Sequence, residues 1–138
     1  MNPSLIKGSC YQDQRGVVQY NNDFDASSCK RIYIIENNSV AILRAWQGHR
    51  VEQRWFSAIQ GSFLIQLIGV DNWETPSINL PKLEYTLTAT TLDILHIPAG
   101  YISSIQALEE NSKLVVMADH QLGEIDDEYR YPFDYFKK

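Results

Sequence analysis

The chain has 138 residues, of which 44% are hydrophobic and 21% are charged. This length and composition suit a single globular domain with its own core, covering residues 1–138. The net charge of −5 argues against a broad basic surface for nucleic acid, but it leaves room for a local basic pocket. The sequence contains no apolar run long enough to cross a membrane, so we expect no membrane partner.

The two cysteines indicate the compartment. The chain starts with a polar segment, Met1 to Lys7, that lacks the apolar centre of a signal peptide. Without a secretory signal, Cys10 and Cys29 are expected to be free, buried or inert thiols in a reducing cytoplasm. The alternative is a disulfide between them.

Short segments rich in β-branched and aromatic residues recur along the chain, with turn residues between them. After a polar lead-in with an early strand, we expect strands at residues 17–20, 30–35, 40–43, 52–59, 62–70, 77–80, 85–87, 92–97, 101–108 and 113–118. No segment shows the sustained 3.6-residue period of an amphipathic helix. The pattern therefore predicts an all-β, antiparallel sandwich or barrel.

The C-terminal segment, residues 119–138, is both acidic and rich in aromatic residues. It is too apolar for a solvated tail, so we expect it to pack on the domain as a short helix or an irregular lid. The acidic run from Asp126 to Glu128 is interpreted as a solvated turn.

One stretch, residues 44–61, carries the densest set of reactive side chains and lies between apolar segments. The set consists of Arg44, His49, Arg50, Glu52 and Arg54. Charged groups between two buried strands are costly unless they face a cavity or pair with one another. We therefore expect a concave site. For Arg44, a functional role and an ion pair with Glu52 both stay open.

Four motifs occur in an order that resembles a known enzyme group. They are Asp-Gln-Arg-Gly at 13–16, Arg-Ile-Tyr-Ile-Ile at 31–35, the stretch 44–61 and Ile-Pro-Ala-Gly-Tyr at 97–101. With them the chain resembles the nucleotide-sugar cupins, namely the dTDP-4-keto-6-deoxyhexose 3,4-ketoisomerases of the WxcM/FdtA/QdtA type. The dTDP-4-dehydrorhamnose 3,5-epimerases are relatives of that group. The likeness covers most of residues 13–119.

The resemblance implies a cupin-type double-stranded β-helix, or jelly roll, assembled as a homodimer in which an N-terminal strand is exchanged. It implies a nucleotide-diphosphate sugar as the ligand. The implied function is isomerisation of a dTDP-linked 4-keto-6-deoxy sugar, by ketone migration or epimerisation, in the biosynthesis of polysaccharide precursors.

The chain departs from the family pattern at Gln47, where both groups usually carry their first histidine. In the epimerases that histidine is the base, so the substitution argues against simple epimerisation. It also keeps open a non-catalytic cupin that binds a nucleotide sugar or carbohydrate. A third reading is a small-molecule sensor or an assembly subunit.

The reactive residues suit proton transfer beside a ketone. A 4-keto sugar has acidic C–H bonds next to its carbonyl, so isomerisation needs a base and a donor at the carbonyl oxygen. His49 is the candidate base because an imidazole titrates near neutral pH, and we expect neighbouring cations to keep it neutral. Arg44 or Arg54 is expected to stabilise the enolate oxygen. Tyr33 or Tyr101 is expected to donate a proton.

The candidates for substrate binding are Arg15, Arg31, Gln47, Arg50 and Arg54. We expect Arg15 and Arg50 to clamp the diphosphate through charge-assisted hydrogen bonds. Gln47 either bonds a sugar hydroxyl or fills the space of the missing histidine.

Three further side chains are expected to be structural. Trp46 and Trp55 are assigned to the core, and His96 to a structural position in its strand.

A metal site is not expected. A metal-dependent cupin needs two histidines spaced H-x-H, a carboxylate soon after and a histidine in the second motif. The first motif offers His49 and Glu52, and residues 98–105 contain no histidine. We therefore predict no metal ligands and no cofactor.

Overall fold

The computed structural model describes residues 1–136, which form twelve strands and one short 3-10 turn. The strands are β1 (Ser4–Ile6), β2 (Ser9–Asp13), β3 (Gly16–Tyr20), β4 (Arg31–Glu36), β5 (Leu43–His49), β6 (Arg54–Gln60), β7 (Ser62–Gly69), β8 (Leu83–Thr88), β9 (Ile94–Ile97), β10 (Tyr101–Ala107), β11 (Lys113–Ala118) and β12 (Glu128–Arg130); the turn is η1 (Ala26–Ser28). The prediction of an all-β, antiparallel fold is confirmed. Within residues 1–136, no helix is long and apolar enough to span a membrane.

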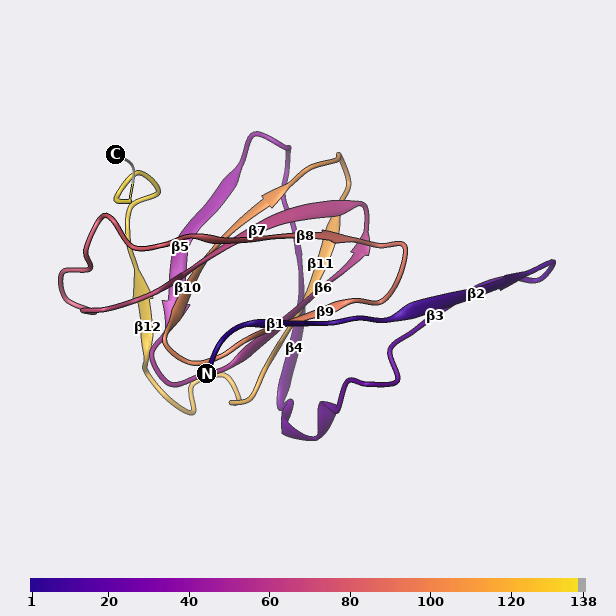
Figure 1. Ribbon diagram of the computed structural model, residues 1–138, viewed down its shortest axis with the longest axis horizontal. Coiled ribbons are helices and arrows are strands. Elements are labelled where there is room, and N and C mark those ends of the chain that lie inside the picture. Colours follow the sequence, from indigo (N-terminus) through magenta and orange to yellow (C-terminus); the bar gives the residue numbers. More distant parts are fainter. Residues whose placement is uncertain (137–138) are drawn as a thin grey trace.

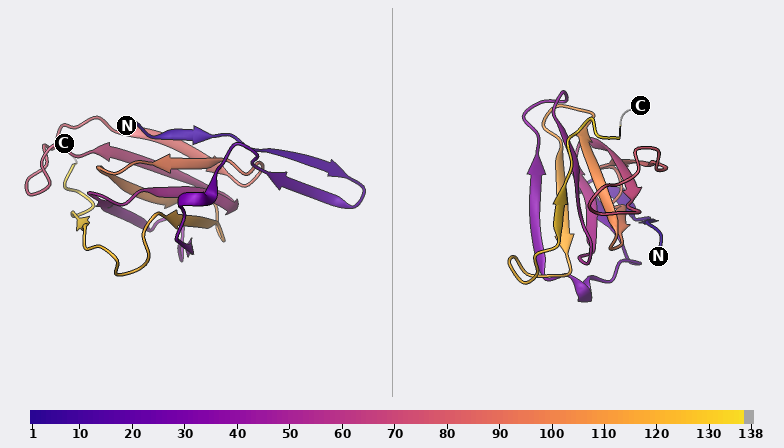
Figure 2. Two further views of the ribbon diagram at one scale, coloured as in Figure 1. Left: turned by 90° about the horizontal axis from the view of Figure 1, so that it is seen from below. Right: turned by 90° about the vertical axis from the view of Figure 1, so that its left-hand side faces the viewer.

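Two five-stranded sheets pack against each other (Figures 1 and 2). One has the order β1-β9-β6-β11-β4 and the other the order β12-β5-β10-β7-β8. Both sheets supply buried apolar side chains to one core, for example Leu114 and Val116 from β11 and Ile65 and Leu67 from β7. Burying such side chains is the main force that holds the sheets together, at about 25 cal/mol for each Å² removed from water.

Strand register brings the reactive residues to one end of the sandwich. His49, the last residue of β5, lies opposite Tyr101, the first residue of β10. Arg54 begins β6 and lies opposite Ala118 at the end of β11. The ends of four strands therefore meet where the charged groups lie, at one end of the apolar core.

The hairpin of β2 and β3 extends away from the two sheets (Figure 1). In the part of the chain that the structure describes, these two strands pair only with each other. The side chains of Tyr11, Val17, Val18 and Tyr20 on the hairpin are all exposed.

Several strand boundaries differ from those expected. The predicted strand at 40–43 is wrong, because β5 begins at Leu43 and continues through the reactive stretch to His49. The amide of Ala41 donates to the Ser39 hydroxyl at 3.1 Å, and the amide of Ile42 donates to the Ser39 carbonyl at 3.3 Å. This serine turn occupies the residues that were expected to resume the sheet.

The predicted strand at 77–80 is also wrong. The amide and the hydroxyl of Ser77 both donate to the carboxylate of Asp71, at 3.1 and 2.6 Å. These two bonds close the connection between β7 and β8 into a loop, which satisfies its polar groups without a neighbouring strand.

The C-terminal segment packs on the domain as expected, since Phe136 is buried against Trp46, and most of its described part is irregular. The short strand within it was not expected. Its residues Glu128–Arg130 form β12, which adds to the edge of the second sheet by pairing with β5. Residues beyond Phe136 lie outside the described part of the chain.

Both cysteines are free thiols. The expectation of free thiols is confirmed; Cys29 is half-buried and Cys10 is exposed on β2, so burial, one of the two alternatives, does not apply to Cys10.

The turn between β6 and β7 generates a stability prediction. Gly61 has φ +70°, and a Cβ on it would lie 2.0 Å from the Ser112 Oγ atom, which accepts a hydrogen bond from the Ser62 amide. We expect Gly61→Ala to lower the free energy of unfolding by about 2–4 kcal/mol, from backbone strain plus overpacking. Urea denaturation measures this loss.

The matched control is Gly123→Ala. Gly123 also has positive φ, +82°, but nothing lies within 4 Å of its added Cβ. It should therefore lose only the backbone term of about 1–2 kcal/mol. Equal losses in the two variants would contradict the packing argument.

Candidate active site

A cavity at this end of the sandwich opens to solvent and, with its mouth included, holds about 600 Å³ of space that no protein atom occupies. Its floor is apolar and includes Phe56 and Ile105. Its polar lining consists of Tyr33, Arg44, Gln47, His49, Glu52, Arg54, Tyr101 and Ser103. Six of the nine residues predicted for the site are therefore in one cavity.

Strand β5 supplies two of these residues on one face. Gln47 and His49 are two positions apart, so their side chains point to the same side of the sheet. Gly48 lies between them, where a Cβ would come within 2.2 Å of the Tyr101 carbonyl oxygen. The glycine thus lets β5 and β10 approach closely. Trp46 faces the other side and packs edge-on against Phe136, with ring centroids 5.5 Å apart.

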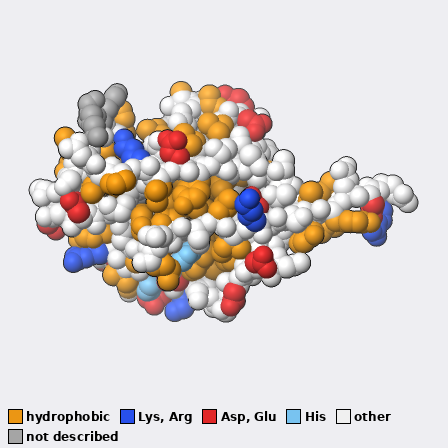
Figure 3. Space-filling view, in the orientation of Figure 1, with side chains coloured by type: hydrophobic (Ala, Val, Ile, Leu, Met, Phe, Trp, Pro, Cys, Tyr) orange, Lys and Arg blue, Asp and Glu red, His pale blue; other side chains and the backbone are white. Residues whose placement is uncertain are grey.

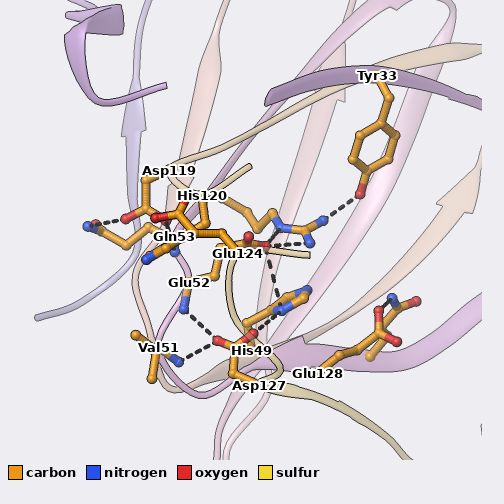
Figure 4. Close-up of polar contacts among 12 residues, drawn as sticks. Tyr33, His49, Val51, Glu52, Gln53, Asp119, His120, Glu124, Asp127 and Glu128 are labelled. Atoms are coloured by element: carbon orange, nitrogen blue, oxygen red, sulfur yellow. Dashed lines mark hydrogen bonds and ion pairs between the residues drawn. The ribbon is translucent and has the colours of Figure 1, made fainter. Parts of the chain in front are cut away.

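The His49 ring is held by a carboxylate from the C-terminal segment (Figure 4). Its Nδ1 atom lies 3.0 Å from Asp127 Oδ1, although the two residues are 78 positions apart in the chain. Both side chains are buried, with 10% and 9% exposure. Because an ionised carboxylate only accepts hydrogen bonds, this contact assigns the proton to Nδ1 in the neutral imidazole. The lone pair is then on Nε2.

The second oxygen of Asp127 organises the turn between β5 and β6. Its Oδ2 atom accepts from the amides of Val51 and Glu52, at 2.8 and 2.7 Å. Burial of the carboxyl opposes its ionisation, but the hydrogen bonds from His49 and the two amides outweigh that effect and hold the pKa of Asp127 below its ordinary value. Asp127 is therefore anionic at neutral pH.

The Nε2 atom of His49 is buried and has no hydrogen-bond partner among residues 1–136. Leaving a buried polar atom unpaired costs about 1–3 kcal/mol. Native structures retain few such atoms, and each of them needs an explanation. Here the unpaired atom is the nitrogen that carries the lone pair.

A second set of contacts continues from His49 along the cavity wall (Figure 4). The Glu52 Oε2 atom lies 3.6 Å from His49 Nδ1 and accepts from Arg54 Nε at 2.6 Å. Arg54 Nη2 lies 2.5 Å from the same oxygen. Arg54 Nη1 in turn donates to the hydroxyl of Tyr33. Along the wall, the imidazole of His49, the carboxylate of Glu52, the guanidinium of Arg54 and the phenol of Tyr33 each contact the next.

One expectation about these charges is wrong, and one of the two alternatives left open for Arg44 does not occur. The charged groups in contact with His49 are carboxylates, not the expected cations, because Glu52 lies between His49 and Arg54. Glu52 pairs with Arg54 rather than with Arg44. Arg44 donates from Nε to Asn37 Oδ1 at 2.6 Å and lies exposed on the cavity wall.

Three predicted binding residues lie outside the cavity. Arg15 is at the tip of the β2–β3 hairpin and pairs with Asp13 at 2.7 Å. Arg50 is exposed in the turn after β5. Arg31 packs its guanidinium 4.6 Å from the centre of the Tyr33 ring and lines a neighbouring hollow under residues 121–128.

The expectation that residues 126–128 are solvated is wrong for Asp127, whose side chain is 9% exposed, and holds for Asp126 and Glu128. Sequence reasoning did not identify Asp127 or Glu128 as site residues. The nearby aromatic residues were the one signal that this segment packs against the domain. The structural assignments are confirmed: Trp46 and Trp55 are buried, and His96 stacks on Trp55 with ring centroids 5.2 Å apart.

One group of side chains has the composition of a metal site. Ligand atoms of Glu52, Asp119 and His120 lie within 4.8 Å of one another. However, the guanidinium of Arg54 already occupies the Glu52 oxygen, and Asp119 accepts from the amide of Gln53 at 2.9 Å. A metal ion at this place would compete with the positive charge of Arg54 for the Glu52 carboxylate. The absence of a metal requirement stays a prediction.

Comparison with known proteins finds similarity in structure but not in sequence. No protein-family model matches the chain, and no curated protein matches it. Among solved structures, a mutant of the 3,4-ketoisomerase QdtA from Thermoanaerobacterium thermosaccharolyticum, in complex with TDP-4-keto-6-deoxyglucose, superposes with a TM-score of 0.71. It is 20% identical, and the match covers 98% of this chain and 91% of that one.

Two further structures support the same comparison. A 3,4-ketoisomerase from Helicobacter canadensis has a TM-score of 0.72 at 18% identity, covering 99% of this chain and 95% of that one. The RmlC epimerase from Mycobacterium tuberculosis has a TM-score of 0.74 at 11% identity, covering 94% of this chain and 68% of that one. These similarities confirm the expected fold, the RmlC-like cupin jelly roll.

The position of Asp127 predicts a pH-dependent contribution to stability. We expect Asp127→Asn to lower the free energy of unfolding by about 1–3 kcal/mol at pH 7, because it weakens the bonds to His49 and two amides. Because the pKa in the folded protein is depressed, this contribution is complete above the unfolded value of about 4 and is lost as the pH falls through the lower folded value. The difference between wild type and variant should therefore shrink below about pH 4.

Urea titrations at a series of pH values test this expectation. Asp126→Asn is the matched control, since its side chain is exposed and adjacent in sequence, and it should leave stability unchanged at every pH. A wild-type advantage over Asp127→Asn that stays constant down to pH 2 would contradict the assignment.

Proposed function

We propose that this protein is a cofactor-independent isomerase that moves the ketone of a nucleotide-linked 4-keto-6-deoxy sugar from C4 to C3. The observation that carries the proposal is the His49–Asp127 pair, which leaves an unpaired Nε2 atom on a cavity residue. The substrate class is supported by the similar QdtA structure, which is a complex with TDP-4-keto-6-deoxyglucose. A place in the biosynthesis of polysaccharide precursors and a cytoplasmic location belong to this proposal.

His49 acts as the base. Nε2 removes the proton from C3, the C–H electron pair forms the C3=C4 double bond, and the C4 oxygen takes up negative charge. The imidazolium then returns the proton to C4. At the same time the electrons of the C3 O–H bond form the new C3=O ketone, and the proton of that hydroxyl passes by way of Tyr33 to the C4 oxygen, which becomes the C4 hydroxyl. Asp127 holds the ring and, with Glu52, stabilises its positive charge. Because Nε2 is buried, the approach of substrate requires a small shift of neighbouring side chains.

Tyr33 exchanges protons with the substrate oxygens. Its hydroxyl accepts a hydrogen bond from Arg54, so its own proton is free for donation into the cavity. Arg54 keeps its charge throughout and favours negative charge on that oxygen. Glu52 fixes the guanidinium in place. This contact favours Tyr33 over Tyr101, whose hydroxyl reaches only the Asn2 side chain at 3.5 Å.

Arg44 is the diphosphate anchor in this proposal. Its Nε atom is held by Asn37, which orients the guanidinium at the exposed part of the cavity wall. A planar guanidinium presents two donors to a phosphate at once. Arg15 and Arg50, which the sequence suggests for this role, do not line the cavity.

A homodimer is part of the proposal. An isolated two-stranded hairpin is marginally stable, and its open edges invite another strand. Apolar side chains gather along the hairpin (Figure 3), and Ile32 and Ile34 on edge strand β4 are 67% and 57% exposed. A second copy that covers both surfaces removes them from water. In such a dimer Arg15 at the hairpin tip becomes available to the partner subunit.

A non-catalytic nucleotide-sugar binding protein is the second candidate. It accounts for the cavity and for Gln47, but it gives no reason for the buried, unpaired Nε2 atom of His49. Turnover separates the two functions.

The central test is His49→Asn. With dTDP-4-keto-6-deoxyglucose as substrate, followed by NMR for ketone migration, we expect wild-type turnover and a loss of about 10²–10⁴-fold in the variant, the usual contribution of a general base. Binding of TDP, measured by calorimetry, should be nearly unchanged because the phosphate anchor is elsewhere.

His96→Asn is the matched control for this substitution. His96 stacks on Trp55 outside the cavity, so its replacement should leave turnover within a few-fold of wild type. Full activity of His49→Asn would remove His49 from the mechanism. TDP-sugar binding without any turnover by wild type would favour the non-catalytic protein.

The dimer predicts a change in molecular mass. We expect light scattering at micromolar concentration to give the mass of two chains for the wild type and of one chain for Val18→Asp or Ile34→Asp, because each buries a charge in the interface. Ile78→Asp is the control, since Ile78 is 48% exposed in the loop before β8. A monomeric wild type would exclude this assembly.

A further inference from the structure

The carboxamide of Gln47 has a fixed orientation. Its Nε2 atom donates to Glu128 Oε2, across the pairing of β5 with β12. A carboxylate only accepts, so the NH2 end of the amide faces Glu128 and the two ends of the amide are distinguished. Glu128 itself is held by Arg130, whose Nε atom donates to Oε1 at 3.0 Å.

Glu128 keeps this acceptor role at neutral pH. Partial burial opposes its ionisation, but the hydrogen bond and charge of Arg130, together with the bond from Gln47, hold the pKa of Glu128 below its ordinary value. The amide of Gln47 is thus oriented by an ionised carboxylate, which accepts only, and not by a protonated carboxyl, which could also donate.

The carbonyl end of the same amide has no such partner. No side chain or amide of residues 1–136 donates to Gln47 Oε1, and Gln47 lines the cavity. Gln47 and His49 share one face of β5, so their Cα atoms are about 7 Å apart. The two residues are therefore spaced so that one sugar ring can contact both the Gln47 carbonyl and the His49 imidazole.

We infer that Gln47 Oε1 accepts a hydrogen bond from the C2 hydroxyl of the sugar, and that Glu128 is the positioning residue that turns the amide for this contact. The inference rests on the proposed function for the identity of the sugar. A 4-keto-6-deoxyhexose linked through C1 has free hydroxyls only at C2 and C3. The C3 hydroxyl loses its proton when the ketone moves, and a neutral amide cannot take that proton up. The C2 hydroxyl remains a donor from substrate to product.

The test compares two ligands that differ only at C2, dTDP-6-deoxyglucose and its 2,6-dideoxy analogue, by calorimetric binding. We expect wild type to bind the first about 3- to 10-fold more tightly, which is the usual effect of one neutral hydrogen bond. Gln47→Met has similar size and no acceptor, so it should bind both ligands equally. Glu128→Gln frees the amide to rotate, and its discrimination should fall between these two.

Gln66→Met is the matched control. Gln66 also donates to a glutamate on a neighbouring strand, Glu84, at 2.6 Å, but it does not line the cavity. Its discrimination should equal that of wild type. The corresponding 4-keto sugars give the same comparison as a ratio of kcat/KM values, the sugar with the C2 hydroxyl over the one without it. We expect this ratio to be about 3 to 10 in wild type and about 1 in Gln47→Met.

The outcomes separate this inference from the proposed function. Discrimination in wild type that disappears in Gln47→Met, without turnover of either 4-keto sugar, would support the contact and reject the isomerase. Turnover with equal binding of the two ligands, or discrimination that survives in Gln47→Met, would overturn the contact alone. Binding of neither ligand would overturn both.

Discussion

The carboxylate of Asp127 is the contact on which the site depends. It satisfies the His49 ring with one oxygen and two amides of the β5–β6 turn with the other. The short strand β12 makes this possible, because pairing of Glu128 with His49 fixes where the preceding residue lies. A three-residue strand at a sheet edge thus places a buried histidine–aspartate pair whose members are far apart in sequence.

The charges next to His49 in the cavity wall are balanced in pairs rather than concentrated. Glu52 contacts both His49 and Arg54. Its negative charge therefore lies between the imidazole and the positive guanidinium and balances the guanidinium. A buried ion pair adds little net stability, because desolvation offsets most of its attraction. Its contribution here is geometric: Arg54 is held where its remaining donor reaches Tyr33. The same groups that cost stability are the ones that a ketone isomerisation uses.

The sequence was sufficient for the fold and for part of the site. Alternating apolar residues identified most strands, and the stretch around His49 and Arg54 identified the cavity. Asp127 was not recognised, since three consecutive acidic residues usually indicate solvent exposure and its burial depends on a partner 78 positions away. Arg15 and Arg50 show the converse limit: a suitable residue type near a motif does not reveal which way its side chain points.

The presence of an amide at position 47 bears on the kind of reaction that this cavity suits. Inversion at two carbons requires proton removal and return on opposite faces, and therefore at least two groups that exchange protons. Movement of a ketone to the adjacent carbon requires one base that takes and returns a proton on one face. With Gln47 oriented by Glu128, β5 offers one proton-exchanging group, His49, and one fixed acceptor. That division of base and acceptor along a single strand face favours 3,4-migration over double epimerisation.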